Sequence, residues 1–172
     1  MRRLTSIIAL AALCSVAFAP AALAAKPVVI DLPPVEFDDP FVCGGDPVIH
    51  VAYEGTFRLS LFFDQEGTLV RDAIVGGGRI SVTFSSATSG RSLSGMSPAP
   101  FRTTYNADGS VARLTASGLN AAITIPGEGV VLLDTGSITW TGGFGGAVEG
   151  AAGPHDWFIG ADTSAFCEYL AG

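Results

Sequence analysis

The sequence predicts an all-β protein, an antiparallel meander of about eight strands that closes into a barrel and ends in one short C-terminal helix. Three observations support this. From residue 48 onward, apolar residues alternate with polar ones at a period of two, as in strands with one buried face. Glycine-containing turn sequences separate the alternating runs. Valine, isoleucine, threonine and phenylalanine carry much of the apolar content, whereas good helix formers other than alanine are scarce.

The first alternating run covers residues 48–64, and Glu54-Gly55 offers a natural bend or bulge inside it. Later strands are separated by loops in which glycine supplies positive φ: Asp64-Gln65-Glu66-Gly67, Gly76-Gly77-Gly78 and Asn106-Ala107-Asp108-Gly109. The remaining strands are expected at 68–74, 79–85, 101–105, 110–116, 119–125, 130–133, 138–140 and 155–159. Because closing a long meander removes its exposed strand edges, a barrel is favoured over a sandwich.

The C-terminal residues carry the only helical pattern. Asp162 can cap a helix over residues 163–170, on which Phe166 and Leu170 share one face at i, i+4 spacing. Cys167 falls on the same predicted helix.

Residues 1–25 have the pattern of a secretory signal peptide. A cationic start, Met1-Arg2-Arg3, precedes an apolar run over 7–16, and Ala22-Leu23-Ala24 matches the small-x-small pattern before a cleavage site. The apolar run is too short for a permanent membrane anchor. The mature protein is therefore expected to be secreted, extracellular or at the cell surface, with no membrane insertion after signal removal.

Two alternative export routes fit this segment less well. Lipidation at Cys14 would want a small residue before the cysteine, where Leu13 stands. Twin-arginine export at Arg2-Arg3 would need a pattern that the following residues, 4–6, lack.

The mature chain is expected to form one acidic domain. Signal removal leaves about 147 residues, a common single-domain size. Subtracting Arg2 and Arg3 from the 9 basic residues leaves 7 against 16 acidic ones. This charge disfavours nucleic acid and anionic membranes as partners. Residues 26–47 form an acidic, proline-rich linker or edge segment without the spacing of a calcium loop, and 48–172 form the barrel domain with its helix.

Once Cys14 has left with the signal, Cys43 and Cys167 are the two remaining cysteines, so one intramolecular disulfide is possible. Closing a loop of about 125 residues would stabilise the fold by at most about 5 kcal/mol in the chain-entropy model. The predicted bridge also removes both thiols from any metal or redox chemistry.

Catalytic candidates are few. The segment from Leu132 to Ser137, which contains Asp134, resembles the active-site signature of aspartic peptidases, in which an aspartate pair activates water. Too little chain follows it for that fold, and Asp-Thr-Gly is also a good turn sequence. His155-Asp156 offers a possible general base, with His50 as the only other imidazole. These histidines lack metal-ligand spacing, so no metal or cofactor is expected.

The aromatic residues are expected either to fill the barrel or to line a ligand cavity in it. Five residues are candidates for contacting a guest: Tyr105, Trp140, Trp157, Arg58 and Arg102. The arginines or Tyr105 would supply the orienting polar groups.

Several segments resemble small exported proteins of high-GC Gram-positive bacteria (actinobacteria), most of them uncharacterised: Gly55-Thr56-Phe57, residues 104–110, Gly118-Leu119-Asn120-Ala121 and residues 166–170. The resemblance covers nearly the whole mature chain and implies no activity. The functional hypothesis is therefore a secreted, monomeric binding or surface-interaction module, with a small apolar molecule as the ligand. The alternatives are a hydrolase that uses Asp134 or His155, and a carbohydrate or cell-wall binder that presents Trp140 or Trp157 to a surface glycan.

Overall fold

The structure is a computed structural model that describes residues 26–45, 47–98, 100–160 and 162–172. The predicted signal peptide, residues 1–25, lies outside the described residues. The described chain forms an antiparallel sheet and a short C-terminal helix. Its elements are β1 (Val28–Leu32), β2 (Glu36–Asp39), β3 (Ile49–Glu54), β4 (Phe57–Phe63), β5 (Leu69–Gly76), β6 (Ser81–Ser86), β7 (Ser92–Met96), β8 (Phe101–Tyr105), β9 (Val111–Ile125), β10 (Gly129–Thr141), β11 (Val148–Ala152) and α2 (Ser164–Ala171).

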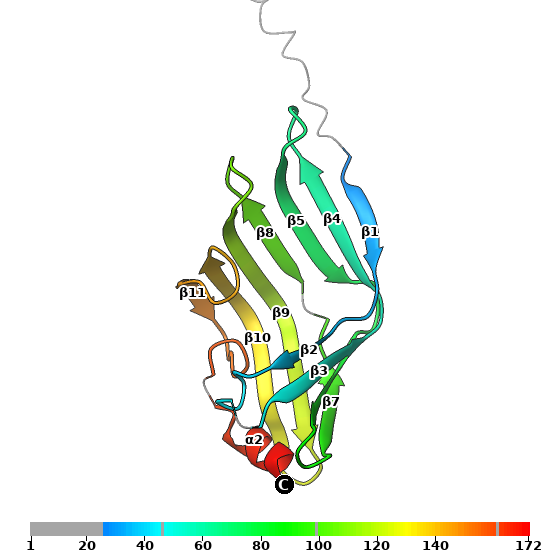
Figure 1. Cartoon of the computed structure of the whole chain (residues 1–172), viewed down its shortest axis with the longest axis vertical. Coiled ribbons are helices and arrows are strands. Elements are labelled where there is room, and N and C mark those ends of the chain that lie inside the picture. The colour runs from blue at the N-terminus through cyan, green and yellow to red at the C-terminus, as the bar shows by residue number, and fades with distance from the viewer. Residues whose placement is uncertain (1–25, 46, 99, 161) are drawn as a thin grey trace, which may run out of the picture.

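The strands form a meander whose early members are bent at mid-length. On one half of the sheet β1, β4, β5 and β8 pair in that order, and on the other half β2, β3, β6 and β7 do. Both sets end on the long strand β9, which pairs with β8 through its first part and with β7 near its end. We call the first set the upper half and the second the lower half, as they stand in Figure 1. The hairpin β9–β10 runs through both halves and joins them.

The bends form one line across the sheet, which we call the crease. Proline or glycine residues mark it: Pro33 and Pro34 between β1 and β2, Gly55 between β3 and β4, Gly77 and Gly78 between β5 and β6, and Pro98 and Pro100 between β7 and β8. Proline cannot donate to a ladder, and glycine adopts backbone angles that other residues avoid. The line continues through β10, where a bulge lies between Asp134 and Thr135. The bend predicted at Glu54-Gly55 is present, and Gly55 has a φ of +120°.

Gly136 is the position where the crease should tolerate a side chain least. Its φ is +112°, and an added Cβ would lie 1.9 Å from the carbonyl oxygen of Ala152. We expect Gly136→Ala to lower the free energy of unfolding by about 1–3 kcal/mol in urea denaturation. Gly129→Ala is the matched control, because Gly129 also has positive φ, +92°, but open space around it. Equal losses in the two variants would show that the close backbone approach does not matter.

The sheet is not closed by hydrogen bonds, so the predicted barrel is not established. The ladder path ends at the edge strands β1 and β2, and at β11 beyond β10, and no ladder among the described residues joins these ends. The strand count also differs from the expected eight, since the sheet has 11 strands. The bend at the crease divides some expected strands in two; the run expected over residues 48–64 forms β3 and β4. The proline-rich segment supplies the two edge strands β1 and β2, whereas residues 155–159, expected as a strand, form turns apart from one bridge between His155 and Asp134.

Non-sheet segments close the lower half instead. Phe166 and Leu170 of α2 are fully buried against the strands, as their predicted shared face requires. The Trp157 indole N–H donates to Asp39, 2.8 Å away, across the gap between the C-terminal segment and β2. The core there is continuous and includes Ile49, Val51, Val82, Phe84, Ile123 and Leu132, all fully buried.

The predicted disulfide between Cys43 and Cys167 is confirmed. It joins residues 124 positions apart and ties α2 to the loop that follows β2. Within the described part of the chain, no helix has the length and apolar character needed to cross a lipid bilayer.

Candidate functional site

One face of the upper half of the sheet is mostly apolar, and the other, which we call the polar face, carries Arg58, Arg71 and Arg102 among some apolar residues. Directly paired residues of antiparallel strands point to the same side, so the register assigns each side chain to a face. Two neighbouring rows of residues that run across the strands form what we call the apolar face. One row consists of Ile30, Leu59, Ile74, Phe101, Ala116 and Ile138, and the other of Val28, Leu61, Asp72, Thr103, Leu114 and Trp140.

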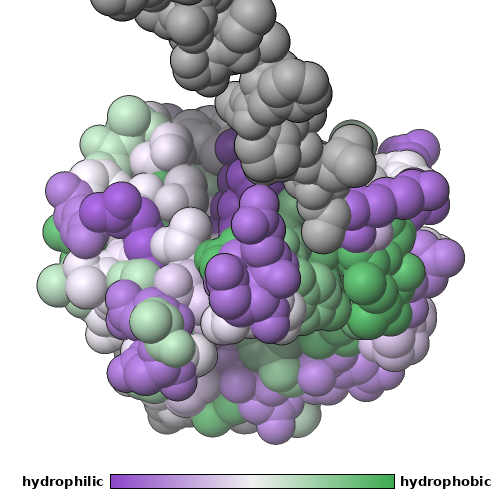
Figure 2. All heavy atoms as spheres, turned by 90° about the horizontal axis from the view of Figure 1, so that it is seen from above, coloured by the Kyte–Doolittle hydropathy of each residue, from purple (hydrophilic) through white to green (hydrophobic). Residues whose placement is uncertain are grey.

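The apolar face is covered at one end and open at the other. Over β10, the rings of Phe144 and Phe158 lie 5.1 and 5.4 Å from that of Trp140, which is only 3 % exposed. Over β1, by contrast, Val28 is 49 % and Ile30 is 42 % exposed. Viewed from the upper end, Figure 2 shows apolar surface gathered between polar borders on the side where β1 and β4 lie. A face this apolar is normally covered by a second layer.

One carboxyl group lies within the apolar face. Asp72 on β5 is 8 % exposed and shares its row with Leu61 and Thr103. The Tyr105 hydroxyl donates to Asp72 Oδ2. The other oxygen, Oδ1, is buried and has no hydrogen-bond partner among the described residues.

Tyr105 is held as a neutral hydrogen-bond donor. Burial, then the hydrogen bond to Asp72 and the negative charge of that carboxylate, raise the pKa of Tyr105 to about 12. At neutral pH its hydroxyl therefore keeps its hydrogen and continues to donate to Oδ2. Because Tyr105 contacts Asp72 and Trp140 lies in the same row as Asp72, two of the five predicted ligand contacts belong to the apolar face.

The other three predicted contacts are placed elsewhere. Arg58 and Arg102 alternate with residues of the apolar face and so point to the opposite, polar face. There Arg58 Nε lies 3.4 Å from the Asp31 carboxylate. Trp157 belongs to the lower half, where its ring packs 5.0 Å from that of Phe84. The arginines therefore cannot orient a molecule on the face that holds Tyr105.

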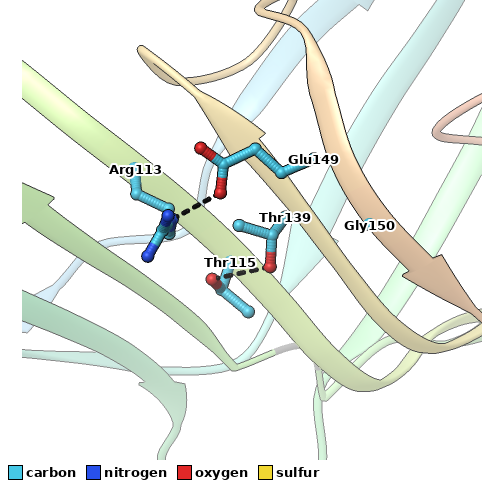
Figure 3. A pocket seen from close by; sticks show the side chains of 5 residues that line it. All are labelled: Arg113, Thr115, Thr139, Glu149 and Gly150. Carbon is cyan, nitrogen blue, oxygen red and sulfur yellow. Dashed lines mark hydrogen bonds and ion pairs between the residues drawn. The ribbon is translucent and has the colours of Figure 1, made fainter.

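An open hollow of about 400 Å³ lies on the polar face (Figure 3). Its lining residues are Arg113, Thr115, Thr139, Glu149 and Gly150. The four side chains among them are already paired: Arg113 Nε lies 2.6 Å from Glu149 Oε2, and the Thr115 and Thr139 hydroxyls are 3.1 Å apart. Hydrogen bonds from Arg113 and then Thr141 lower the pKa of Glu149. With its polar groups engaged and no aromatic lining, the hollow offers little to a sugar.

The tryptophans do not form an exposed platform. Trp140 is almost completely covered, and Trp157 is half-buried with its indole N–H bound to Asp39. Binding of a glycan by ring stacking needs an accessible aromatic face. The described arrangement gives no support to that alternative.

Asp134 and His155 meet in the interior. Asp134 is 0 % and His155 is 1 % exposed, and His155 Nδ1 lies 3.0 Å from Asp134 Oδ1. The Asn120 side-chain amide donates to the same oxygen over 2.9 Å, and the Phe158 backbone N–H donates to Oδ2 over 2.9 Å. The expected Asp-Thr-Gly turn is wrong, because these residues lie within β10 at its bulge.

This pair has the contacts of a structural group rather than those of a catalyst. His155 Nε2 lies 3.2 Å from the carbonyl oxygen of Ser137, which can only accept, so this nitrogen must carry a hydrogen. It is therefore not free to take a proton from a substrate. Among the described residues no second carboxyl group is hydrogen-bonded to Asp134. Asp156 instead accepts the Leu133 backbone N–H over 2.8 Å.

Asp72 is the site residue that sequence reasoning missed. The alternation of apolar and polar residues in the sequence already indicated Asp72. It lies two positions before Ile74 on β5 and so occupies a position of the apolar face. Elsewhere in the described ranges, no three His, Cys, Asp or Glu side chains are grouped as metal ligands.

No protein-family model, curated protein or solved structure matches this chain. The resemblance to exported actinobacterial proteins therefore stays a prediction, and the geometry alone must support any function.

Proposed function

We propose that the protein is an exported, monomeric binding module that holds a small apolar molecule against the apolar face of its upper half. The observation that supports this most strongly is the uneven cover of that face. Phe144 and Phe158 complete it over β10, while Val28 and Ile30 remain half exposed over β1. A small molecule would there take the place of a second layer and remove apolar surface from water.

The rest of the molecule suits such a role. The lower half is closely packed and tied by the disulfide, which gives the open half a firm support. A disulfide is typical of proteins that work outside the reducing cytoplasm, in agreement with the predicted signal peptide.

A titration with 1-decanol, followed by calorimetry, tests the proposal. We expect saturable binding by the mature wild-type protein and at least about tenfold weaker binding by Leu61→Asn, because Leu61 lies on the apolar face between Val28 and Asp72. Val130→Asn is the matched control, since Val130 is an exposed apolar residue in the β9–β10 hairpin, near its turn. Circular dichroism checks that both variants fold.

Two results would contradict the proposal. One is the absence of decanol binding by the wild type. The other is a stable dimer in native mass spectrometry that Leu61→Asn separates, because a second copy would then be what covers the face.

A further inference from the structure

Asp72 is an unusual group to find in a surface that otherwise suits an apolar molecule. Its row contains Leu61, Thr103, Leu114 and Trp140, and the residue is only 8 % exposed. Buried carboxyl groups are normally paired with a cation or fully hydrogen-bonded. From the described residues Asp72 receives one hydrogen bond, which a neutral phenol donates to Oδ2.

No cationic side chain of the described residues compensates this group. The neighbouring Arg71 points to the polar face, where its guanidinium lies 4.0 Å from the centre of the Phe62 ring. The arginine and histidine side chains of the described residues that lie close to a carboxylate contact other acidic residues: Asp31, Glu36, Asp38, Asp134 and Glu149. The apolar face thus carries a single uncompensated acidic group with one oxygen left to accept.

We propose that Asp72 makes this face selective for amphiphiles that carry one protonated amine on an apolar body, with the ammonium bound to Oδ1. This inference rests on the proposed function, because it assigns the polar contact of the same site. The apolar body would lie along Leu61, Leu59 and Ile30 toward the open edge at β1. Tyr105 would continue to hold Oδ2 and so fix the carboxylate plane.

The charge of the whole chain acts in the same direction. With 16 acidic residues and 9 basic ones, the protein attracts cations and repels anions at long range. At short range, the Coulomb attraction between two charges in an apolar environment is stronger than that at an exposed carboxylate, because water screens it less. Since Oδ1 is itself shielded, the side chains around it must move aside as the ammonium enters.

Three linear ten-carbon probes test the inference: decylamine, 1-decanol and decanoate, titrated calorimetrically at neutral pH below their aggregation concentrations. We expect the wild type to bind decylamine at least about tenfold more tightly than decanol, and decanoate least tightly. Asp72→Asn should reduce the amine preference to within about twofold while decanol binding persists. Tyr105→Phe should keep the preference, because the phenol occupies only Oδ2.

Glu128→Gln is the matched control, since it removes the same charge from an exposed residue in the β9–β10 turn. It should leave the preference unchanged. Equal binding of decylamine and decanol by the wild type, or a preference that survives in Asp72→Asn, would overturn the role of Asp72 and leave the proposed function standing. Failure of all three probes to bind would overturn both.

Discussion

Asp134→Ala is expected to lower the free energy of unfolding by about 3–5 kcal/mol, as measured by urea denaturation. The Asp134 carboxylate is fully buried and accepts hydrogen bonds from the Asn120 side chain and the Phe158 backbone, and it faces His155 Nδ1. Its removal would leave these groups buried without an acceptor, which costs more than the hydrogen bonds themselves contribute.

A double-mutant cycle with His155→Ala sharpens this test. If the two side chains act as one unit, the double variant should lose less stability than the sum of the single losses, by about 0.5–3 kcal/mol. Glu128→Ala, at an exposed position, should change stability by no more than about 0.5 kcal/mol. A loss below about 1 kcal/mol for Asp134→Ala would contradict the structural role and reopen the catalytic alternative.

Replacing both cysteines by serine is expected to cost about 2–5 kcal/mol of stability. The bridge between Cys43 and Cys167 spans 124 positions, so its removal frees nearly the whole mature chain in the unfolded state. The double variant avoids leaving one thiol unpaired in the lower half. Reduction of the wild type with dithiothreitol should lower its melting temperature to about that of the double variant. The melting temperature of the double variant should not change with the reductant. A wild type insensitive to the reductant would show that the bridge adds no stability.

The parts of the fold that local chemistry determines were predictable from the sequence. The bend at Gly55 follows from glycine inside an alternating run, and the burial of Phe166 and Leu170 follows from their helical spacing. The disulfide followed from having only two cysteines after signal removal. None of these features depends on knowing which distant segments meet.

Features that depend on distant partners were not predictable in this way. Asp134 lies in a strand that pairs with β9 rather than in a turn, and Asn120, His155 and Phe158 contact its carboxylate from other parts of the chain. Closure by α2 and Trp157, instead of a final strand pair, likewise needs the tertiary arrangement. The placement of Arg58 and Arg102 on the polar face is different, because their phase relative to Leu59 and Phe101 was already visible in the alternation.

The crease has a consequence for how the protein fluctuates. Strands β3 and β6 contribute to a continuous buried core that includes residues of α2, whereas the apolar side of β1 is half exposed and that of β4 is only partly buried. Amide groups of one continuous sheet should therefore exchange hydrogen at very different rates on its two sides, with the edge at β1 opening most readily. A bound amphiphile would slow exchange in β1, β4 and β5 and leave β3 and β6 almost as they were, so occupancy of the face can be read from the backbone alone.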